Sequence, residues 1–161
     1  MRDPEVLEGH PRKTAPGARR LALLSVLPLR RFTGVGENII RRVLLVEDDP
    51  GMREAIRALL ARVGYQVAAV SDGVEAWEQL GRGPRFAAIL VDLYTPRMTG
   101  HDLVARVRRT PRLCGVPIIA MSAERGDVPA AQAFLAKPFS REQLVSALEQ
   151  VGAAGIASAG T

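Results

Sequence analysis

Residues 42–50, Arg-Val-Leu-Leu-Val-Glu-Asp-Asp-Pro, decide the fold that this chain is expected to adopt. The run Arg42 to Val46 is short, apolar and closed by a turn signal, which is typical of a strand buried on both faces of a parallel sheet. Three later runs follow the same pattern, and each is ended by a different polar residue: Phe86 to Val91 before Asp92, Val116 to Met121 before Ser122, and Ala133 to Ala136 before Lys137. Stretches with helical spacing separate most of these runs, so the sequence predicts an α/β fold.

The polar residues at the ends of these strands are expected to meet in space. The carboxyl ends of parallel strands share one edge of the sheet, and open α/β folds carry their chemistry at that edge. Three acids, a hydroxyl and a lysine would therefore converge: Glu47, Asp48, Asp92, Ser122 and Lys137.

Four stretches carry the apolar spacing of amphipathic helices. They are Met52 to Val63, which Gly64 can close, Val74 to Leu80 after the turn Ser71-Asp72-Gly73, the segment around Leu103 to Val107, and Leu144 to Val151, which Ser140 can cap. A further strand, Tyr65 to Val70, lies between the first two helices. Strands and helices thus alternate along the chain, and their crossovers should be right-handed.

The composition suits one globular domain with a basic N-terminal extension. The chain has 161 residues, of which 47% are hydrophobic and 24% charged. A single cysteine, Cys114, allows no internal disulfide, so a reducing compartment such as the cytoplasm is expected. Residues 1–42 contain nine Lys/Arg and four Asp/Glu, whereas residues 43–161 contain thirteen of each. The net charge of +5 therefore belongs to the extension.

Residues 1–41 show no sustained periodicity, and we expect them to be disordered. Their apolar run Leu21 to Leu29 is too short to cross a bilayer, and no convincing cleavage site for a secretory signal follows it. A short amphipathic or basic anchor, a solvated tail, and upstream sequence added by a misplaced start codon all stay open. At the other end, residues 153–161 are expected to form a flexible tail, so no output domain is expected to follow the globular part.

Four motifs in a fixed order resemble the receiver domain of two-component response regulators, the CheY-like superfamily. The motifs are Val-Leu-Leu-Val-Glu-Asp-Asp-Pro at 43–50, Asp-Leu-Tyr-Thr-Pro-Arg-Met-Thr-Gly at 92–100, Met-Ser-Ala at 121–123 and Lys-Pro-Phe at 137–139. The resemblance covers residues 42–152. It implies a flavodoxin-like, doubly wound sheet of five parallel strands in the order 2-1-3-4-5, with helices on both faces.

The resemblance also implies the site residues. Asp92 would accept a phosphoryl group, and Mg²⁺ would be bound directly by Asp48, Asp92 and the main-chain carbonyl of Tyr94, and through water by Glu47. Ser122 and Lys137 would contact the phosphoryl oxygens. The switch would consist of Ser122, which moves toward the phosphoryl group, and Phe134, which rotates inward. The Lys137-Pro138 bond would be cis.

Elementary chemistry supports this set of residues. An aspartate can accept a phosphoryl group as an acyl phosphate. Clustered carboxylates repel one another in a dry site, so they need a cation, and Mg²⁺ prefers oxygen ligands. Asp49, by contrast, stands directly before a predicted helix, where a helix cap is the favoured interpretation.

Two features depart from the family pattern. Only fourteen residues lie between Ser122 and Lys137, and the segment contains Gly126 and Pro129, so a shortened fourth helix is expected. That helix is part of the family's usual signalling surface. In addition, Thr99 stands where the family commonly has an acid.

The sequence therefore predicts a stand-alone response regulator. A histidine kinase or a histidine phosphotransfer protein would phosphorylate it, and it would bind a downstream protein. It would be no enzyme beyond catalysing its own phosphorylation and dephosphorylation. A receiver-fold interaction module regulated without phosphorylation is the alternative. Nucleic-acid binding through the N-terminal arm is disfavoured, because its arginines lack interleaved aromatic residues.

Overall fold

The computed structural model describes residues 41–83, 85–124, 128 and 130–157. The predicted N-terminal arm lies almost entirely outside the described residues, as do residues 158–161. The boundaries of the arm, the domain and the tail therefore remain predictions.

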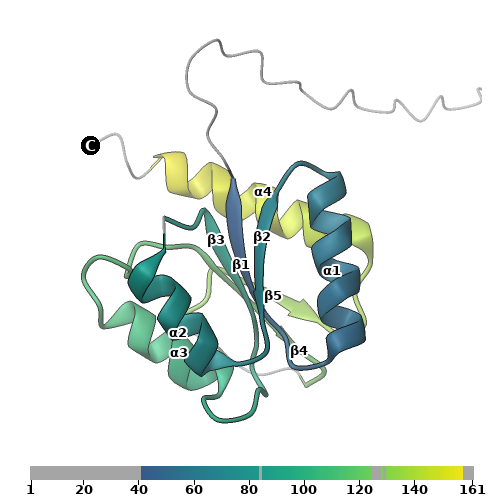
Figure 1. Ribbon diagram of the computed structural model, residues 1–161. Helices are drawn as coiled ribbons and strands as arrows, with labels where there is room; N and C mark the ends of the chain where they lie inside the picture. Colours follow the sequence, from purple (N-terminus) through teal and green to yellow (C-terminus); the bar gives the residue numbers. More distant parts are fainter. Residues whose placement is uncertain (1–40, 84, 125–127, 129, 158–161) are drawn as a thin grey trace, which may run out of the picture. The chain divides into compact units, whose positions relative to one another are not determined.

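The sheet has five parallel strands in the order β2-β1-β3-β4-β5, as predicted (Figure 1). The strands are β1 Arg42–Val46, β2 Gln66–Val70, β3 Ala88–Asp92, β4 Ile118–Ser122 and β5 Ala133–Ala136. The third and fourth strands begin two residues later than predicted, because the pairing of β3 with β1 starts at Ala88 opposite Val43 and that of β4 with β3 starts at Ile118.

The helices lie on both faces of the sheet. They are α1 Pro50–Arg62, α2 Gly73–Arg82, α3 Gly100–Arg108 and α4 Arg141–Ala157. Figure 1 shows α2 and α3 side by side on one face, and α1 and α4 share the core of the other face. Within the part of the chain that the structure describes, no helix combines the length and the apolar character needed to cross a membrane.

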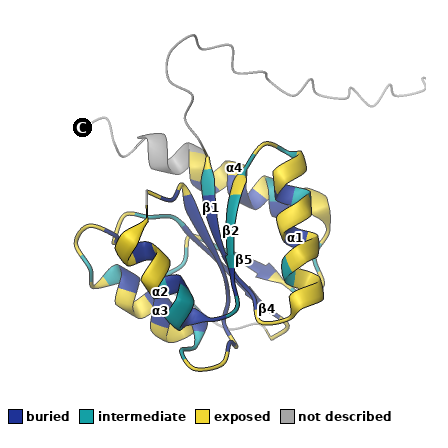
Figure 2. Ribbon diagram, in the orientation of Figure 1, coloured by how far each residue is buried: buried dark blue, intermediate teal, exposed yellow. Residues whose placement is uncertain are grey.

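Two hydrophobic cores follow from the pleat of the strands, in which successive side chains point to opposite faces. Val43 and Leu45 of β1 pack with α1 and α4, whereas Leu44 and Val46 pack with α2 and α3. All four residues are fully buried, so the central strands appear dark blue between helices whose outer faces are exposed (Figure 2). This double burial explains why the strand runs are continuously apolar.

Polar side chains begin each helix, in agreement with the sequence pattern. The backbone amide of Met52 donates to Asp49 Oδ1 at 2.6 Å, which confirms the predicted cap. The other caps are made by Asp72 at α2, by Thr99 at α3 and by Ser140 at α4. Thr99 thus performs the capping role that an acid could also perform at its position.

The connection between β4 and β5 departs most from the regular alternation of strands and helices. None of its described residues is helical, and residues 125–127 and 129 lie outside the described part. Side-chain hydrogen bonds organise the end of the connection instead: Gln132 Oε1 accepts from the amide of Ile118 at 2.7 Å and from Arg108 Nη2 at 2.7 Å. The expected shortening of a helix here agrees with the described residues.

Candidate functional site

Three carboxylates meet at the carboxyl ends of β1 and β3. Carboxylate oxygens of Glu47, Asp48 and Asp92 all lie within 4.8 Å of one another. Glu47 and Asp92 are buried, with 1% and 7% of their surface exposed, whereas Asp48 is exposed to solvent. The structure thus brings together the three acids that the order of the strands was expected to bring together, with one side of the cluster open.

A lysine that directly follows the edge strand β5 contacts two of these acids. Lys137 follows β5, and its Nζ donates to Glu47 Oε2 at 2.6 Å and to Asp92 Oδ2 at 2.5 Å. The Lys137-Pro138 bond is cis, as expected. One ammonium cannot balance three carboxylates, so the cluster keeps a net negative charge that favours a divalent cation.

Burial and ion pairing act in opposite directions on these groups. Burial raises the pKa of Glu47 above its usual value, and this outweighs the lowering by Lys137. Burial by itself would lower the pKa of Lys137, but its hydrogen bonds to Asp92 and Glu47 raise that pKa above the usual value. Lys137 is therefore an ammonium at neutral pH.

Ser122 ends β4 at the same edge of the sheet. It is buried and pairs with Ala136, and its carbonyl accepts from the amide of Lys137 at 2.8 Å. Its Oγ accepts from the amide of Glu124 at 3.0 Å, which leaves the hydroxyl proton available for a further acceptor.

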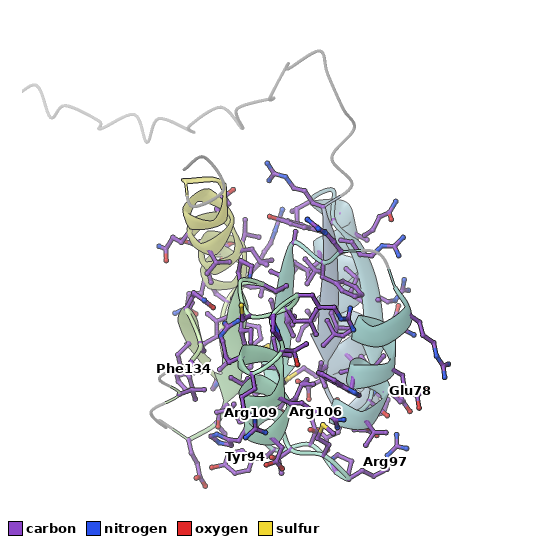
Figure 3. The ribbon with its side chains drawn as sticks, turned by 90° about the vertical axis from the view of Figure 1, so that its left-hand side faces the viewer. Glu78, Tyr94, Arg97, Arg106, Arg109 and Phe134 are labelled. Carbon is purple, nitrogen blue, oxygen red and sulfur yellow. The ribbon has the colours of Figure 1, made fainter. Side chains whose placement is uncertain are left out.

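The loop from Leu93 to Thr99 follows Asp92 in the chain and begins beside its carboxylate. The amide of Tyr94 donates to Asp92 Oδ1 at 2.9 Å, so the loop backbone lies beside the acids. Tyr94 is 58% exposed, and its hydroxyl donates to Glu124 Oε2 at 3.2 Å. The Tyr94 side chain therefore lies at the surface, at the end of the domain shown at the bottom of Figure 3.

The side chains of Asp49 and Phe134 do not belong to the carboxylate cluster. Asp49 is exposed and caps α1, and the cluster of possible metal ligands does not include it. Phe134 is half-buried on the edge strand β5 (Figure 3). It lines a groove of about 730 Å³ between β5 and α4, together with Phe139 and Ala147.

Sequence reasoning missed the contribution of two arginines near the site. Arg53 Nη1 donates to the carbonyl oxygens of Glu47 at 2.8 Å and of Asp48 at 3.1 Å, and so holds the backbone of the acidic segment. Arg97 contacts the start of α2. Both arginines lie at positions that the spacing of apolar residues marks as surface positions, so this spacing predicts neither contact.

The set of oxygen donors suits Mg²⁺ and phosphoryl chemistry. Carboxylates with an open, solvated side match an ion that keeps several waters. A buried hydroxyl and an ammonium at the same edge are donors that can bind the oxygens of a phosphoryl group.

Comparison with known proteins agrees with this arrangement. The sequence profile of the response regulator receiver domain matches residues 43–149. The chain is 35% identical over 118 residues to the chemotaxis protein CheY1 of Helicobacter pylori, and the alignment covers 68% of this chain and 95% of that protein.

Solved structures resemble the chain in the same way. The receiver domain of the sensor histidine kinase PA1611 of Pseudomonas aeruginosa, solved with a magnesium ion in its active-site cleft, is 35% identical with a TM-score of 0.66, covering 70% of this chain and 98% of that one. The chemotaxis response regulator CheY4 of Vibrio cholerae is 30% identical with a TM-score of 0.65, at 70% and 98% coverage.

Proposed function

The chain belongs to the response regulator receiver domain family of two-component signalling, and we propose that it accepts a phosphoryl group on Asp92 in a Mg²⁺-dependent reaction. The observation that carries this proposal is the position of Asp92, which contacts the Lys137 ammonium and lies within 4.8 Å of the Glu47 and Asp48 carboxylates. With Mg²⁺ bound beside Lys137, such a site would compensate both the charge of its own acids and the charge of an incoming phosphoryl group.

Each residue of the site would have its own role in phosphoryl transfer. A carboxylate oxygen of Asp92 forms the new O–P bond while the bond between phosphorus and the donor breaks, and the electron pair leaves with the donor. Glu47, Asp48, Asp92 and the Tyr94 main-chain carbonyl would hold Mg²⁺, which supplies positive charge beside the transferring group.

The signal would arise from contacts that exist only after transfer. In the structure, Lys137 is bound to Glu47 and Asp92. After transfer, Lys137 and the Ser122 hydroxyl would bind phosphoryl oxygens, and Phe134 would rotate inward to fill the space that Ser122 leaves. Contacts of this kind differ between the two states, and only such differences can shift a conformational equilibrium.

The partners follow from the family. We propose that a histidine kinase or a histidine phosphotransfer protein in the cytoplasm donates the phosphoryl group, and that the receiver domain, residues 42–152, signals by binding a downstream protein. The basic residues 1–41 and the tail 153–161 would lie outside that domain.

One observation favours a second candidate function. Lys137 forms ion pairs with both buried acids, Glu47 and Asp92, so each of them has a partner within the protein itself. A receiver-fold interaction module regulated without phosphorylation would need no more than this.

Intact mass measured after incubation with acetyl phosphate and Mg²⁺ distinguishes the two candidate functions. We expect one phosphoryl group on the wild-type chain, none on Asp92→Asn, and wild-type labelling of Asp102→Asn, an exposed acid on α3. Labelling of Asp92→Asn would disprove the site. An unlabelled wild type, with small phosphodonors and with a phosphorylated histidine protein, would favour the second function.

A further inference from the structure

Arg97 adopts a backbone conformation that arginine rarely adopts. Its φ is 62°, and it is the one non-glycine residue with positive φ among the described residues. Glycine adopts this conformation without steric cost, and asparagine adopts it far more often than arginine does. An arginine in this conformation, in the loop beside the carboxylates, points to a role for its side chain.

The side chain of Arg97 contacts two acids of α2. Its Nε donates to Asp72 Oδ2 at 2.6 Å, its Nη2 also contacts that oxygen, and Nη2 donates to Glu75 Oε1 at 3.0 Å. Asp72 is 1% exposed and caps α2 by accepting from the amides of Val74 and Glu75. A buried carboxylate held by several donors is a firm anchor for the guanidinium.

The backbones meet at the same place. The amide of Gly73 donates to the carbonyl of Met98 at 3.2 Å, and a Cβ on Gly73 would lie only 2.7 Å from that oxygen. At the other end of the loop, the amide of Tyr94 donates to Asp92. The loop between Asp92 and α3 is therefore attached to the acidic cluster at its start and to α2 at its end.

We propose that Arg97 is a positioning residue for the divalent cation: through Asp72 and Glu75 it holds the loop so that the main-chain carbonyl of Tyr94 faces the carboxylate cluster. This inference rests on the proposed function, because it assumes that the carbonyl is a ligand. A glycine in place of Arg97 would adopt this backbone conformation without strain, but it has no side chain to contact α2. Arginine adopts the conformation at a steric cost, and its side chain attaches the loop to α2.

A purely structural ion pair would have the same geometry, and Mg²⁺ affinity separates the two roles. Arg97→Gly removes the guanidinium and relieves the strained backbone, so we expect the melting temperature to change by less than about 5 °C. Mg²⁺ affinity measured by calorimetry should nevertheless fall by about tenfold or more, as for other residues that orient metal ligands. Hydrogen exchange in residues 93–99 should become faster.

Asp72→Asn provides a second, independent variant. Asparagine is also a good helix cap, so the start of α2 should persist while the charge that anchors Arg97 is lost. We expect a loss of Mg²⁺ affinity here too, and no more loss in the double variant than in Arg97→Gly alone, because both changes break the contact between Arg97 and Asp72. The control is Arg85→Ala, which removes an exposed arginine near the opposite ends of the strands.

Each outcome bears on a different claim. A wild-type chain that binds no Mg²⁺ would overturn the proposed function. A wild-type chain that binds Mg²⁺, with unchanged affinity in Arg97→Gly or in Asp72→Asn, would overturn the positioning role alone. Losses that add in the double variant would overturn it as well, because the two residues would then act separately. If Arg97→Gly does not fold, Asp72→Asn alone decides.

Discussion

At the scale of single residues, the charge of the site depends on neighbours that are far apart in the chain. Lys137 lies 90 residues from Glu47 and 45 from Asp92, yet its ammonium contacts both. Removing one partner of such a buried contact leaves the other charge without compensation, which costs more than the contact itself contributes. Neighbouring acids need not share a role, and Asp48 and Asp49 provide the clearest case.

Asp48→Ala and Asp49→Ala should have different consequences. Asp48 belongs to the carboxylate cluster, so its loss should abolish Mg²⁺-dependent phosphorylation. Asp49 caps α1, so its loss should cost about 1 kcal/mol of stability and leave most of the phosphorylation. Denaturant unfolding and intact mass measure the two effects. Asp49→Asn, which keeps the cap, is the control, and equal loss of labelling in both alanine variants would contradict the assignment.

Asp72 should make the stability depend on acid pH. Burial acts to raise the pKa of Asp72, but hydrogen bonds from the Glu75 amide and from Arg97 outweigh it and hold the pKa below its usual value. The unfolded chain therefore binds the proton more tightly than the folded chain. At pH values above the unfolded-state pKa, the ionised Asp72 carboxylate stabilises the fold fully. This stabilisation is lost as the pH falls through the folded-state pKa.

Melting curves of the wild type and Asp72→Asn between about pH 5 and about pH 2 test this dependence. The wild type should be more stable at the upper end by at most about 1 kcal/mol, since Arg97 is half exposed. The difference should shrink toward the lower end. A difference that is constant across the range would show that the charge of Asp72 does not contribute.

At the scale of elements, the first turn of α3 lies directly against the end of β3. The amide of Gly100 donates to the carbonyl of Leu93 at 3.0 Å, and a Cβ on Gly100 would lie 2.1 Å from the carbonyl oxygen of Asp92. The position of this helix is therefore coupled to the backbone of the predicted phosphoacceptor.

Gly100→Ala should destabilise the domain by about 1–3 kcal/mol, because backbone atoms must move to admit the methyl group. Gly81→Ala is the matched control. Gly81 lies within α2 with open space at its Cβ, so alanine there should stabilise by about 0.5–1 kcal/mol. Urea unfolding compares the two variants. A Gly100→Ala protein as stable as the wild type would show that α3 can shift freely.

At the scale of the whole molecule, the connection between β4 and β5 leads from Ser122 to the edge strand of the sheet. Its described residues form no helix, and β5 is the edge strand of the sheet. Phosphorylation should still act on this region, because Ser122 and Lys137 follow strands whose positions the sheet determines.

The phosphorylated or beryllofluoride-bound protein should remain mostly monomeric at micromolar concentration. A well-packed interface needs on the order of 1,000 Å², and a short connection reduces the surface that the family usually offers for dimers. Sedimentation measures the association state, and hydrogen-exchange changes should concentrate in residues 121–139. A tight, phosphorylation-dependent dimer built on that face would refute the expectation.

The sequence by itself determined the features that depend on local patterns. Continuous apolar runs mark strands buried on both faces, and apolar residues at helical spacing mark the helices. Asp49 and Ser140 could be recognised as caps because a cap bonds to an amide only a few residues away. The strand order and the candidate site followed from motifs that resemble a known family.

Only the tertiary structure decided which distant side chains touch. The contact of Arg97 with Asp72, 25 residues away, and the half-burial of Phe134 leave no periodic trace in the sequence. Each depends on how far apart two elements lie once the cores on both faces of the sheet are packed. That separation is set by the sum of many side-chain contacts, and no short stretch of sequence contains it.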